Sequence, residues 1–196
     1  MSNECMSLPP VVSDLGEWVR PKTTEVRLLK YPKEEDWLFV KQCAYETIGA
    51  EASTPPPMEW KRKILRARHS PIRELPFAFE LVNIPYWVSV HLCRHHVGCQ
   101  PYVRSQRNDR QSEYDRNTAP QNAPVNMIWT MNAEALMTIA SKRLCNKASK
   151  ETREVVERMC KLVLEYCPEF MGALVPPCCQ HNGGCREMTS CWKEGK

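Results

Sequence analysis

Apolar side chains recur every three to four residues in five stretches of the chain, which is the spacing of helices with one buried face. Trp37, Val40 and Ala44 show this spacing in the first stretch. Asn132 and Ser149 have side chains that suit the caps of the last two helices. The pattern predicts helices over residues 34–49, 58–68, 85–97, 132–143 and 149–167.

Residues 77–81 follow a different pattern, in which large apolar side chains alternate with smaller or polar ones. This alternation predicts a strand with one buried face. Residues up to about 33 are expected to form an extended arm, and the polar residues 108–124 a loop. The sequence therefore predicts an α+β fold, with helices packed on a small antiparallel sheet. Residues 1–175 would form this domain, and residues 176–196 a Cys-rich C-terminal tail.

The size and charge of the chain are those of a one-domain protein with a real core. Its 196 residues carry a formal net charge of +4, which does not demand a nucleic-acid partner. No apolar run is long enough to span a membrane, and Met1-Ser2-Asn3-Glu4 does not begin a signal pattern. The 11 cysteines are an odd number and are expected to be reduced thiols. These features predict a cytoplasmic protein with no membrane partner.

The strongest chemical feature is a segment rich in arginine and histidine, residues 91–110. It holds three of the 5 histidines and four arginines, with few aliphatic residues between them. Burying unpaired cations is costly, so this segment is not expected to lie in the core. An arginine fork matches phosphate or carboxylate, and histidine exchanges a proton near neutral pH. The segment predicts a site for an anionic small molecule.

Two blocks of short motifs occur in order along the chain. The first contains Ser70-Pro71, Arg94-His95-His96 and Ser105-Gln106-Arg107. The second contains Trp129-Thr130-Met131-Asn132-Ala133 at the opening of a predicted helix, then Arg143, then Ala148-Ser149-Lys150-Glu151-Thr152-Arg153. Over about residues 68–168 these motifs, in this order and spacing, resemble the flavin-dependent thymidylate synthases.

The resemblance implies reductive methylation of dUMP to dTMP by a homotetramer with FAD as cofactor. Methylenetetrahydrofolate and NADPH would be the co-substrates, and neither a metal nor nucleic acid would be required. By resemblance, the residues along FAD are Ser70, Arg94, His95, His96 and Arg143. The residues at the nucleotide are His91, Ser105, Gln106, Arg107 and Arg153. Arg153 is the expected catalytic residue, near the pyrimidine, where it can stabilise developing negative charge.

The chain departs from the family pattern at several positions. His96 stands where the second arginine of an Arg-His-Arg motif is usual, and Asn108 stands where tyrosine is typical. An acidic residue expected between the two motifs is missing, and the loop 108–124 is shorter than in many members. These departures suggest either a divergent branch of the family or loss of the reaction with nucleotide binding retained.

The same residues also have plainer interpretations. Arg107 could be a solvated loop cation, His95 a histidine satisfied in the core, and Arg143 and Arg153 members of intrahelical pairs. Two other functions remain open: a related flavin enzyme that modifies a pyrimidine differently, for example by hydroxymethylation, and a non-catalytic nucleic-acid-binding module. The binding module is disfavoured, because the segment lacks interleaved aromatic residues.

The C-terminal tail carries four cysteines and one histidine within residues 178–191. These are ligand types of a zinc site, although their spacing does not match a common zinc finger. A metal site and an ordered tail that is metal-free or disulfide-bonded remain alternatives.

Overall fold

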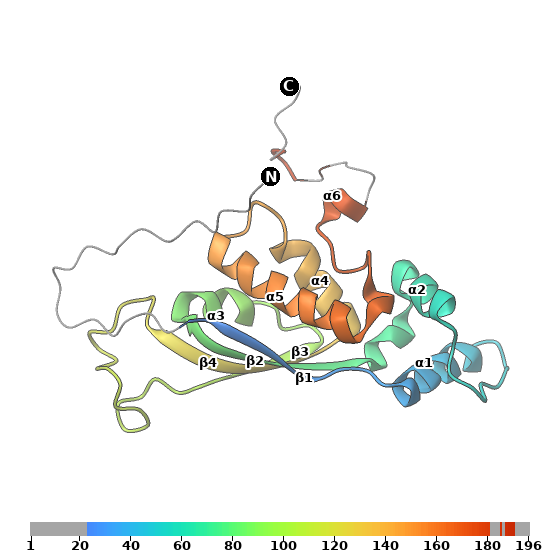
Figure 1. Cartoon of the computed structure of the whole chain (residues 1–196), viewed down its shortest axis with the longest axis horizontal. Helices are drawn as coiled ribbons and strands as arrows, with labels where there is room; N and C mark the ends of the chain where they lie inside the picture. The colour runs from blue at the N-terminus through green and yellow to red at the C-terminus, as the bar shows by residue number, and fades with distance from the viewer. Residues whose placement is uncertain (1–22, 181–184, 186, 191–196) are drawn as a thin grey trace.

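The computed structural model describes residues 23–180, 185 and 187–190, and in it an antiparallel sheet of four strands carries helices on one face (Figure 1). The strand order is β1-β2-β4-β3. The strands are β1 (Glu25–Lys30), β2 (Pro76–Pro85), β3 (Cys99–Val103) and β4 (Pro124–Asn132). The predicted α+β class, with helices on a small antiparallel sheet, is confirmed.

The predicted helices are all present, with shifted ends. In Figure 1, α3, α4 and α5 lie across the sheet, and α1 and α2 lie at one end of it. The α-helices are α1 (Glu34–Glu46), α2 (Met58–Ala67), α3 (Tyr86–Cys93), α4 (Ala133–Arg143), α5 (Lys150–Tyr166) and the short α6 (Pro177–Gln180). Two 3-10 helices are η1 (Ser70–Glu74) and η2 (Pro168–Phe170). Among the described residues, no helix has both the length and the apolar character needed to cross a membrane.

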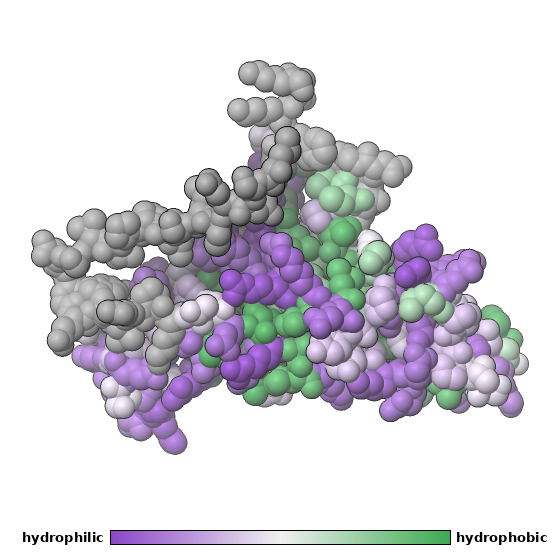
Figure 2. Space-filling model, viewed as in Figure 1, coloured by the Kyte–Doolittle hydropathy of each residue, from purple (hydrophilic) through white to green (hydrophobic). Residues whose placement is uncertain are grey.

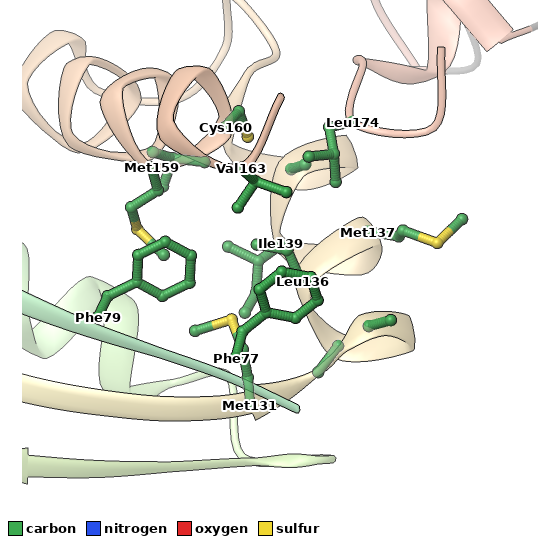
Figure 3. Packing of buried hydrophobic residues seen from close by; sticks show 14 of the residues in the cluster. Phe77, Phe79, Met131, Leu136, Met137, Ile139, Met159, Cys160, Val163 and Leu174 are labelled. Carbon is green, nitrogen blue, oxygen red and sulfur yellow. The ribbon is translucent and has the colours of Figure 1, made fainter. Parts of the chain in front are cut away.

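The core lies between the sheet and the helices α4 and α5. Phe77 and Phe79 of β2 and Met131 of β4 point toward Leu136 of α4 and Met159 of α5 (Figure 3). All five side chains are buried. Burying such side chains is the main force that holds these helices on the sheet.

Four local predictions were wrong. Part of the expected N-terminal arm is β1, and the helix predicted to reach residue 97 ends at Cys93. The strand β3 was missed, because its five residues include Pro101 and several exposed side chains. An edge strand needs a partner on one side alone, so its sequence carries little apolar alternation. The strand β4 was missed as well, whereas α4 begins at Ala133, directly after the predicted cap Asn132.

The two predicted helix caps have different outcomes. The side chain of Asn132 accepts a hydrogen bond from the backbone N–H of Ala135 at 2.9 Å and caps α4, as expected. Ser149 occupies the position before α5, but its hydroxyl donates to Thr152 Oγ1 at 2.8 Å and caps no backbone group. The side chain of Asn132 also packs closely against Gly98. A Cβ atom at position 98 would lie 2.8 Å from Asn132 Nδ2. Gly98 has φ +69°, so it turns the chain from α3 into β3 where a larger residue would not fit.

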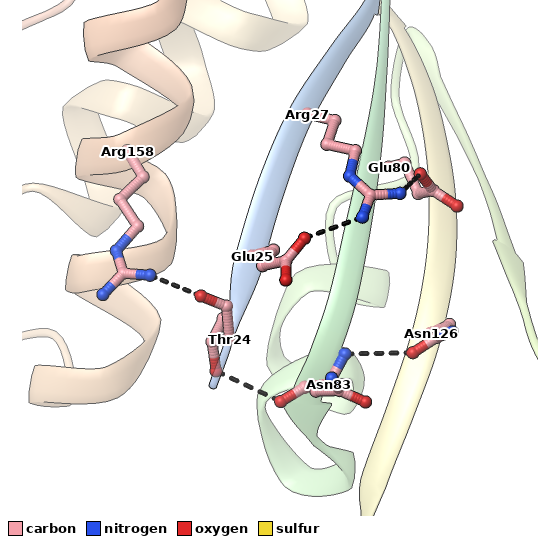
Figure 4. A network of polar contacts seen from close by, with 7 residues as sticks. All are labelled: Thr24, Glu25, Arg27, Glu80, Asn83, Asn126 and Arg158. Carbon is pink, nitrogen blue, oxygen red and sulfur yellow. Dashed lines mark hydrogen bonds and ion pairs between the residues drawn. The ribbon is translucent and has the colours of Figure 1, made fainter. Parts of the chain in front are cut away.

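A polar network ties β1 to the rest of the fold (Figure 4). Arg158 of α5 donates to the carbonyl of Thr24, and the Thr24 hydroxyl donates to the carbonyl of Asn83 at 3.1 Å. The N–H of Asn83 donates to Asn126 Oδ1 at 2.9 Å, which links β2 to β4. Asn83 has φ +54°, a left-handed conformation within a strand, where the register of β2 and β4 shifts between Leu81 and Ile84.

Part of the C-terminal tail lies outside the described residues, including the candidate metal ligands His181 and Cys191. Within the part of the chain that the structure describes, no group of three or more His, Cys, Asp or Glu side chains is placed to hold a metal ion. The boundary at residue 175 and the state of the tail therefore stay predictions.

Candidate functional site

The described part of the chain contains a cavity of about 550 Å³ beside α3. It is lined by this helix, by the end of β3 and by the loop that follows β3. The volume is within the range of small-molecule sites. Figure 2 shows mainly hydrophilic residues at the end of the molecule where this loop lies. No acidic residue contributes to the lining. Four arginines do: Arg94, Arg104, Arg107 and Arg116. We call this the arginine cavity.

Three local structures bring these arginines together. Arg94 is the C-cap of α3, where a cation is favoured by the carbonyl end of the helix. Arg104 directly follows β3, and its N–H donates to the carbonyl of Asn126 at 2.9 Å. The N–H of Arg116 donates to Asn108 Oδ1 at 2.8 Å, so Asn108 holds this part of the loop in place. These contacts use backbone N–H groups, and no hydrogen bond to another described residue uses the guanidinium group of Arg104 or Arg116.

Arg107 differs from the other three because an internal carboxylate is bound to its fork. Its Nε and Nη2 donate to the two carboxylate oxygens of Asp109, each at 2.8 Å. Both side chains are more than half exposed, at 60% and 55%, so this pair is easily exchanged with other anions. The geometry shows that the fork is presented flat toward a two-oxygen anion, as phosphate recognition requires.

The lining of the arginine cavity concentrates positive charge. Arg94, Arg104 and Arg116 form no ion pair with an acidic side chain among the described residues. Like charges that share one cavity repel each other, and a bound phosphate or carboxylate would relieve this repulsion. The arrangement can therefore bind and orient an anionic ligand.

A second polar group lies on the other side of α3, between that helix and α4 and α5. Arg143 of α4 donates from Nε to His95 Nε2 at 2.8 Å and from Nη2 to the carbonyl of His91 at 2.9 Å. His91 Nδ1 lies 3.4 Å from Thr152 Oγ1 of α5. We call these four residues the inner polar cluster: His91, His95, Arg143 and Thr152.

The contact with Arg143 determines the protonation of His95. A guanidinium N–H can only donate, so Nε2 of His95 must accept and the ring proton must be on Nδ1. Burial is the largest cause that lowers the pKa of His95, and the charges of Arg143 and Arg94 lower it further, to about 4. His95 is therefore a neutral imidazole with a fixed tautomer at neutral pH. Burial and the charge of Arg94 also lower the pKa of Arg143, which stays protonated.

The two cysteines near the site are not activated. Cys93 lines the arginine cavity, and burial raises its pKa. Cys99 donates to the carbonyl of His95 at 2.9 Å, and burial raises its pKa as well. Both are half-buried thiols at neutral pH, as expected for residues that are not nucleophiles.

The structure divides the residues that the sequence predicted for the site. Arg94, Ser105, Gln106 and Arg107 line the arginine cavity. His91, His95 and Arg143 belong to the inner polar cluster, although the sequence predicted His91, Arg94 and His95 within one helix over residues 85–97. The helix ends at Cys93, and Arg94, its C-cap, lines the arginine cavity whereas the two histidines do not.

Three predicted residues lie outside both groups. Ser70 is the exposed first residue of η1, and Arg153 is a half-buried residue in the first turn of α5. His96 is exposed, and its Nδ1 lies 3.2 Å from the carbonyl of Arg94. None of the three is among the residues that line the arginine cavity. Their assignment to FAD or nucleotide stays a prediction.

Two residues of the cavity were missed from the sequence. Arg104 adjoins the Ser105-Gln106-Arg107 motif, and its position at the end of an arginine-rich segment was a usable signal. Arg116 gave no such signal, because it lies in a polar loop that shows no periodicity. Hydrogen bonds of the Asn108 side chain with Asp115 and Arg116 bring this part of the loop back to the cavity.

The fold and the cavity define an α+β protein with a site that suits anionic ligands. Residues 108–169 match the family model described as thymidylate synthase complementing protein. This match covers the second block of motifs and leaves out the first block, which holds two of the four cavity arginines, Arg94 and Arg107. No curated protein is similar enough in sequence to count as a match.

Two solved structures are similar to the chain in fold. One is thymidylate synthase X (ThyX) from Helicobacter pylori with FAD and dUMP, at a TM-score of 0.60 and 14% sequence identity, over 81% of this chain and 100% of that chain. The other is the UMP/dUMP methylase PolB from Streptomyces cacaoi bound with 5-Br dUMP, at a TM-score of 0.61 and 17% identity, over 79% of this chain and 98% of that chain. At these identities the likeness shows a shared fold, and the family-model match extends over residues 108–169.

Proposed function

We propose that this protein is a flavin-dependent enzyme that methylates dUMP to dTMP, with methylenetetrahydrofolate and NADPH as co-substrates. One observation carries the proposal: the arginine cavity combines four guanidinium groups with no acidic residue, within the family fold. dUMP, FAD, NADPH and the folate all bear phosphate or carboxylate groups. Binding and orienting such ligands is the main task that the protein itself performs in a flavin enzyme.

The donor set of the site fits FAD. Bound FAD would supply the hydride for the reaction, and the residues expected beside it are Ser70, Arg94, His95, His96 and Arg143. In the structure, Arg143 already donates to His95 and to the carbonyl of His91. We therefore assign Arg143 to positioning, since it holds His95 as a neutral ring whose Nδ1–H is left to donate. Arg94, whose guanidinium lies in the cavity, would contact a phosphate directly.

The nucleotide is assigned to the other wall of the cavity. Ser105, Gln106 and Arg107 would bind its phosphate, and Arg107 would exchange Asp109 for it. His91 and Arg153 complete the proposed nucleotide site, with Arg153 as the catalytic residue near the pyrimidine. Neither contacts the arginine cavity of the same subunit, which supports a homotetramer whose sites form between subunits. A cytoplasmic location is part of the same proposal.

The test is product analysis with the purified full-length protein. The protein is expected to show flavin absorption and to convert dUMP to dTMP only when methylenetetrahydrofolate, NADPH and FAD are all present. UMP is the second candidate substrate, because PolB, whose fold is similar to that of this chain, is a UMP/dUMP methylase. A flavin-free protein that forms no methylated product from dUMP or UMP would contradict the proposal. A hydroxymethylated product would identify a related reaction in its place.

A further inference from the structure

A second cavity, of about 260 Å³, lies on the other side of the segment Arg104-Ser105-Gln106. These three residues line both cavities, so they form the wall between them. The second cavity is bounded by the register shift of β2, by the beginning of β4 and by the loop that contains Tyr114. It is smaller than a site for a whole nucleotide and suits one ring system.

The two cavities differ in chemistry. The second is lined mainly by neutral amide and hydroxyl groups, with one arginine and one glutamate, whereas the first has four arginines. The neutral polar side chains are Asn83, Ser105, Gln106, Gln111, Tyr114 and Asn126. Side-chain amides carry a donor beside an acceptor, so they pair with ligand edges that offer the reverse arrangement. We call this the amide cavity.

The walls of the amide cavity are held in fixed orientations. Asn126 Oδ1 accepts from the N–H of Asn83, whose left-handed backbone stores strain at this point (Figure 4). Gln106 Nε2 donates to the hydroxyl of Tyr114 at 2.9 Å, and Gln111 Nε2 donates to the carbonyl of Tyr114 at 2.7 Å. Two amide groups lining the cavity make no hydrogen bond with another described residue: Asn126 Nδ2, a donor, and Gln106 Oε1, an acceptor.

We propose that the amide cavity is a subsite for a planar heterocycle with a lactam edge, meaning an N–H group beside a C=O group. Asn126 Nδ2 would donate to the ring carbonyl, and Gln106 Oε1 would accept from the ring N–H. The phosphate or carboxylate of the same ligand would lie across the shared wall in the arginine cavity. The inference rests on the proposed function, in which two ligands have this chemistry: the pyrimidine of dUMP and the pterin of the folate. Adenine lacks a lactam edge.

The test uses Asn126→Asp in the full-length protein. Aspartate keeps an oxygen that can accept from the Asn83 N–H, and it removes only the Nδ2 donor. The dissociation constants of dUMP, tetrahydrofolate, AMP and 2-deoxyribose 5-phosphate would be measured for both proteins. We expect dUMP or tetrahydrofolate to bind at least about tenfold more weakly, which is the loss of one well-made hydrogen bond. The carboxylate introduced at position 126 repels all four anionic ligands. The change in the dissociation constant of dUMP or tetrahydrofolate is therefore compared with the change for AMP and 2-deoxyribose 5-phosphate.

Arg116→Ala is the matched control. Arg116 lines the arginine cavity and not the amide cavity, so its loss should weaken dUMP and 2-deoxyribose 5-phosphate by the same factor. Tyr114→Phe is the second test variant, because it removes the hydroxyl that orients Gln106 without adding charge. It should produce the same selective loss, and it keeps the inference testable if Asn126→Asp does not fold.

Each outcome is decisive. A selective loss for dUMP identifies the pyrimidine as the ring, and a selective loss for tetrahydrofolate identifies the pterin. Equal losses for all four ligands in both folded variants would overturn the subsite, and the proposed function would stand if the wild-type protein still forms dTMP. A wild-type protein that binds neither dUMP nor tetrahydrofolate would overturn the proposed function and the subsite together.

Discussion

Arg94 and His95 are neighbours in the sequence, but they belong to two regions with opposite electrostatic character. The arginine cavity holds four cations, three of which have no acidic partner among the described residues. The inner polar cluster holds one cation, Arg143, and all of its observed partners are neutral acceptors. In the arginine cavity the guanidinium groups have N–H donors left for a ligand. In the inner polar cluster the guanidinium group of Arg143 donates to other groups of the protein.

This difference shows that residues of one motif can have different tasks. The C-terminus of α3 separates them, because Arg94 is the C-cap and His95 is the first residue beyond it. A cation that already donates to a backbone carbonyl acts on structure, and its removal should be seen in stability. A cation that faces open space acts on the ligand, and its removal should be seen in binding. Each of the following substitutions tests one side of this division.

The largest effect is expected for Arg143→Ala, on stability. The change leaves the carbonyl of His91 and Nε2 of His95 without their donor in a partly buried position. We expect the free energy of unfolding to fall by about 2–4 kcal/mol, since each orphaned acceptor costs about 1–3 kcal/mol. Urea unfolding followed by circular dichroism would measure it. The exposed neighbour Lys142→Ala is the control, and an equal small effect of both changes would break the comparison.

The next effect, on binding, is expected for Arg107→Ala. Loss of a charge-assisted contact should weaken dUMP by about 1.5–3 kcal/mol, or one to two decades in affinity, and should leave FAD largely in place. Stability should change little, because the Arg107–Asp109 pair is more than half exposed, at 60% and 55%. Isothermal titration with dUMP is the measurement.

Arg110→Ala is a close control for Arg107. Arg110 is exposed, three residues away, and lies near the same Asp109, with Nε 3.7 Å from Oδ2. It does not line the arginine cavity. If both substitutions weaken dUMP equally, the effect comes from net charge and the assignment of the Arg107 fork to phosphate is wrong.

A smaller effect concerns the pH dependence of stability. The pKa of His95 is lowered from 6.5 to about 4 in the folded protein, so the unfolded chain binds more protons between these values. Stability should therefore decrease as the pH falls from about 6.5 toward 4. His95→Gln, which keeps an acceptor for Arg143, should flatten this decrease. The measurement is the urea midpoint at several pH values, and identical slopes for both proteins would show that His95 does not titrate in this way.

The sequence predicted one strand and several helices from their apolar faces, but it missed β4, whose buried Val125, Met127, Trp129 and Met131 also alternate. Phe77 and Phe79 alternate as a strand requires, and the helices α1, α2, α4 and α5 carry their apolar residues at helical spacing. The strand β3 lies at the sheet's edge and buries little, so its sequence contains no such pattern. Hydrophobic periodicity reports burial, and elements that are held by backbone pairing alone escape it.

The candidate site was predicted in part for a related reason. Residue types identified Arg94, Ser105, Gln106 and Arg107, because the concentration of arginine is itself unusual. The separation of His91 and His95 from Arg94 depends on where α3 ends, which the sequence placed four residues too late. The position of Arg116 at the cavity depends on its contact with the side chain of Asn108. This contact lies within a loop, and the local sequence pattern does not predict it.

The smallest effect is expected for Asp109→Asn, and it tests whether the arginine cavity is partly blocked by its own chain. Asp109 occupies both donors of the Arg107 fork that phosphate would use, at 2.8 Å each. An exposed pair of this kind is worth about 0.2–1 kcal/mol, so its removal should strengthen dUMP binding by about 1.4- to 5-fold. Removing a negative charge also raises the general potential, so the same change is made in the Arg107→Ala protein. If Asp109 acts by occupying the fork, Asp109→Asn should have no effect in that background, and the two changes will not be additive. An equal gain in both backgrounds would mean that Asp109 acts only through long-range charge, and that the fork is not exchanged between carboxylate and phosphate.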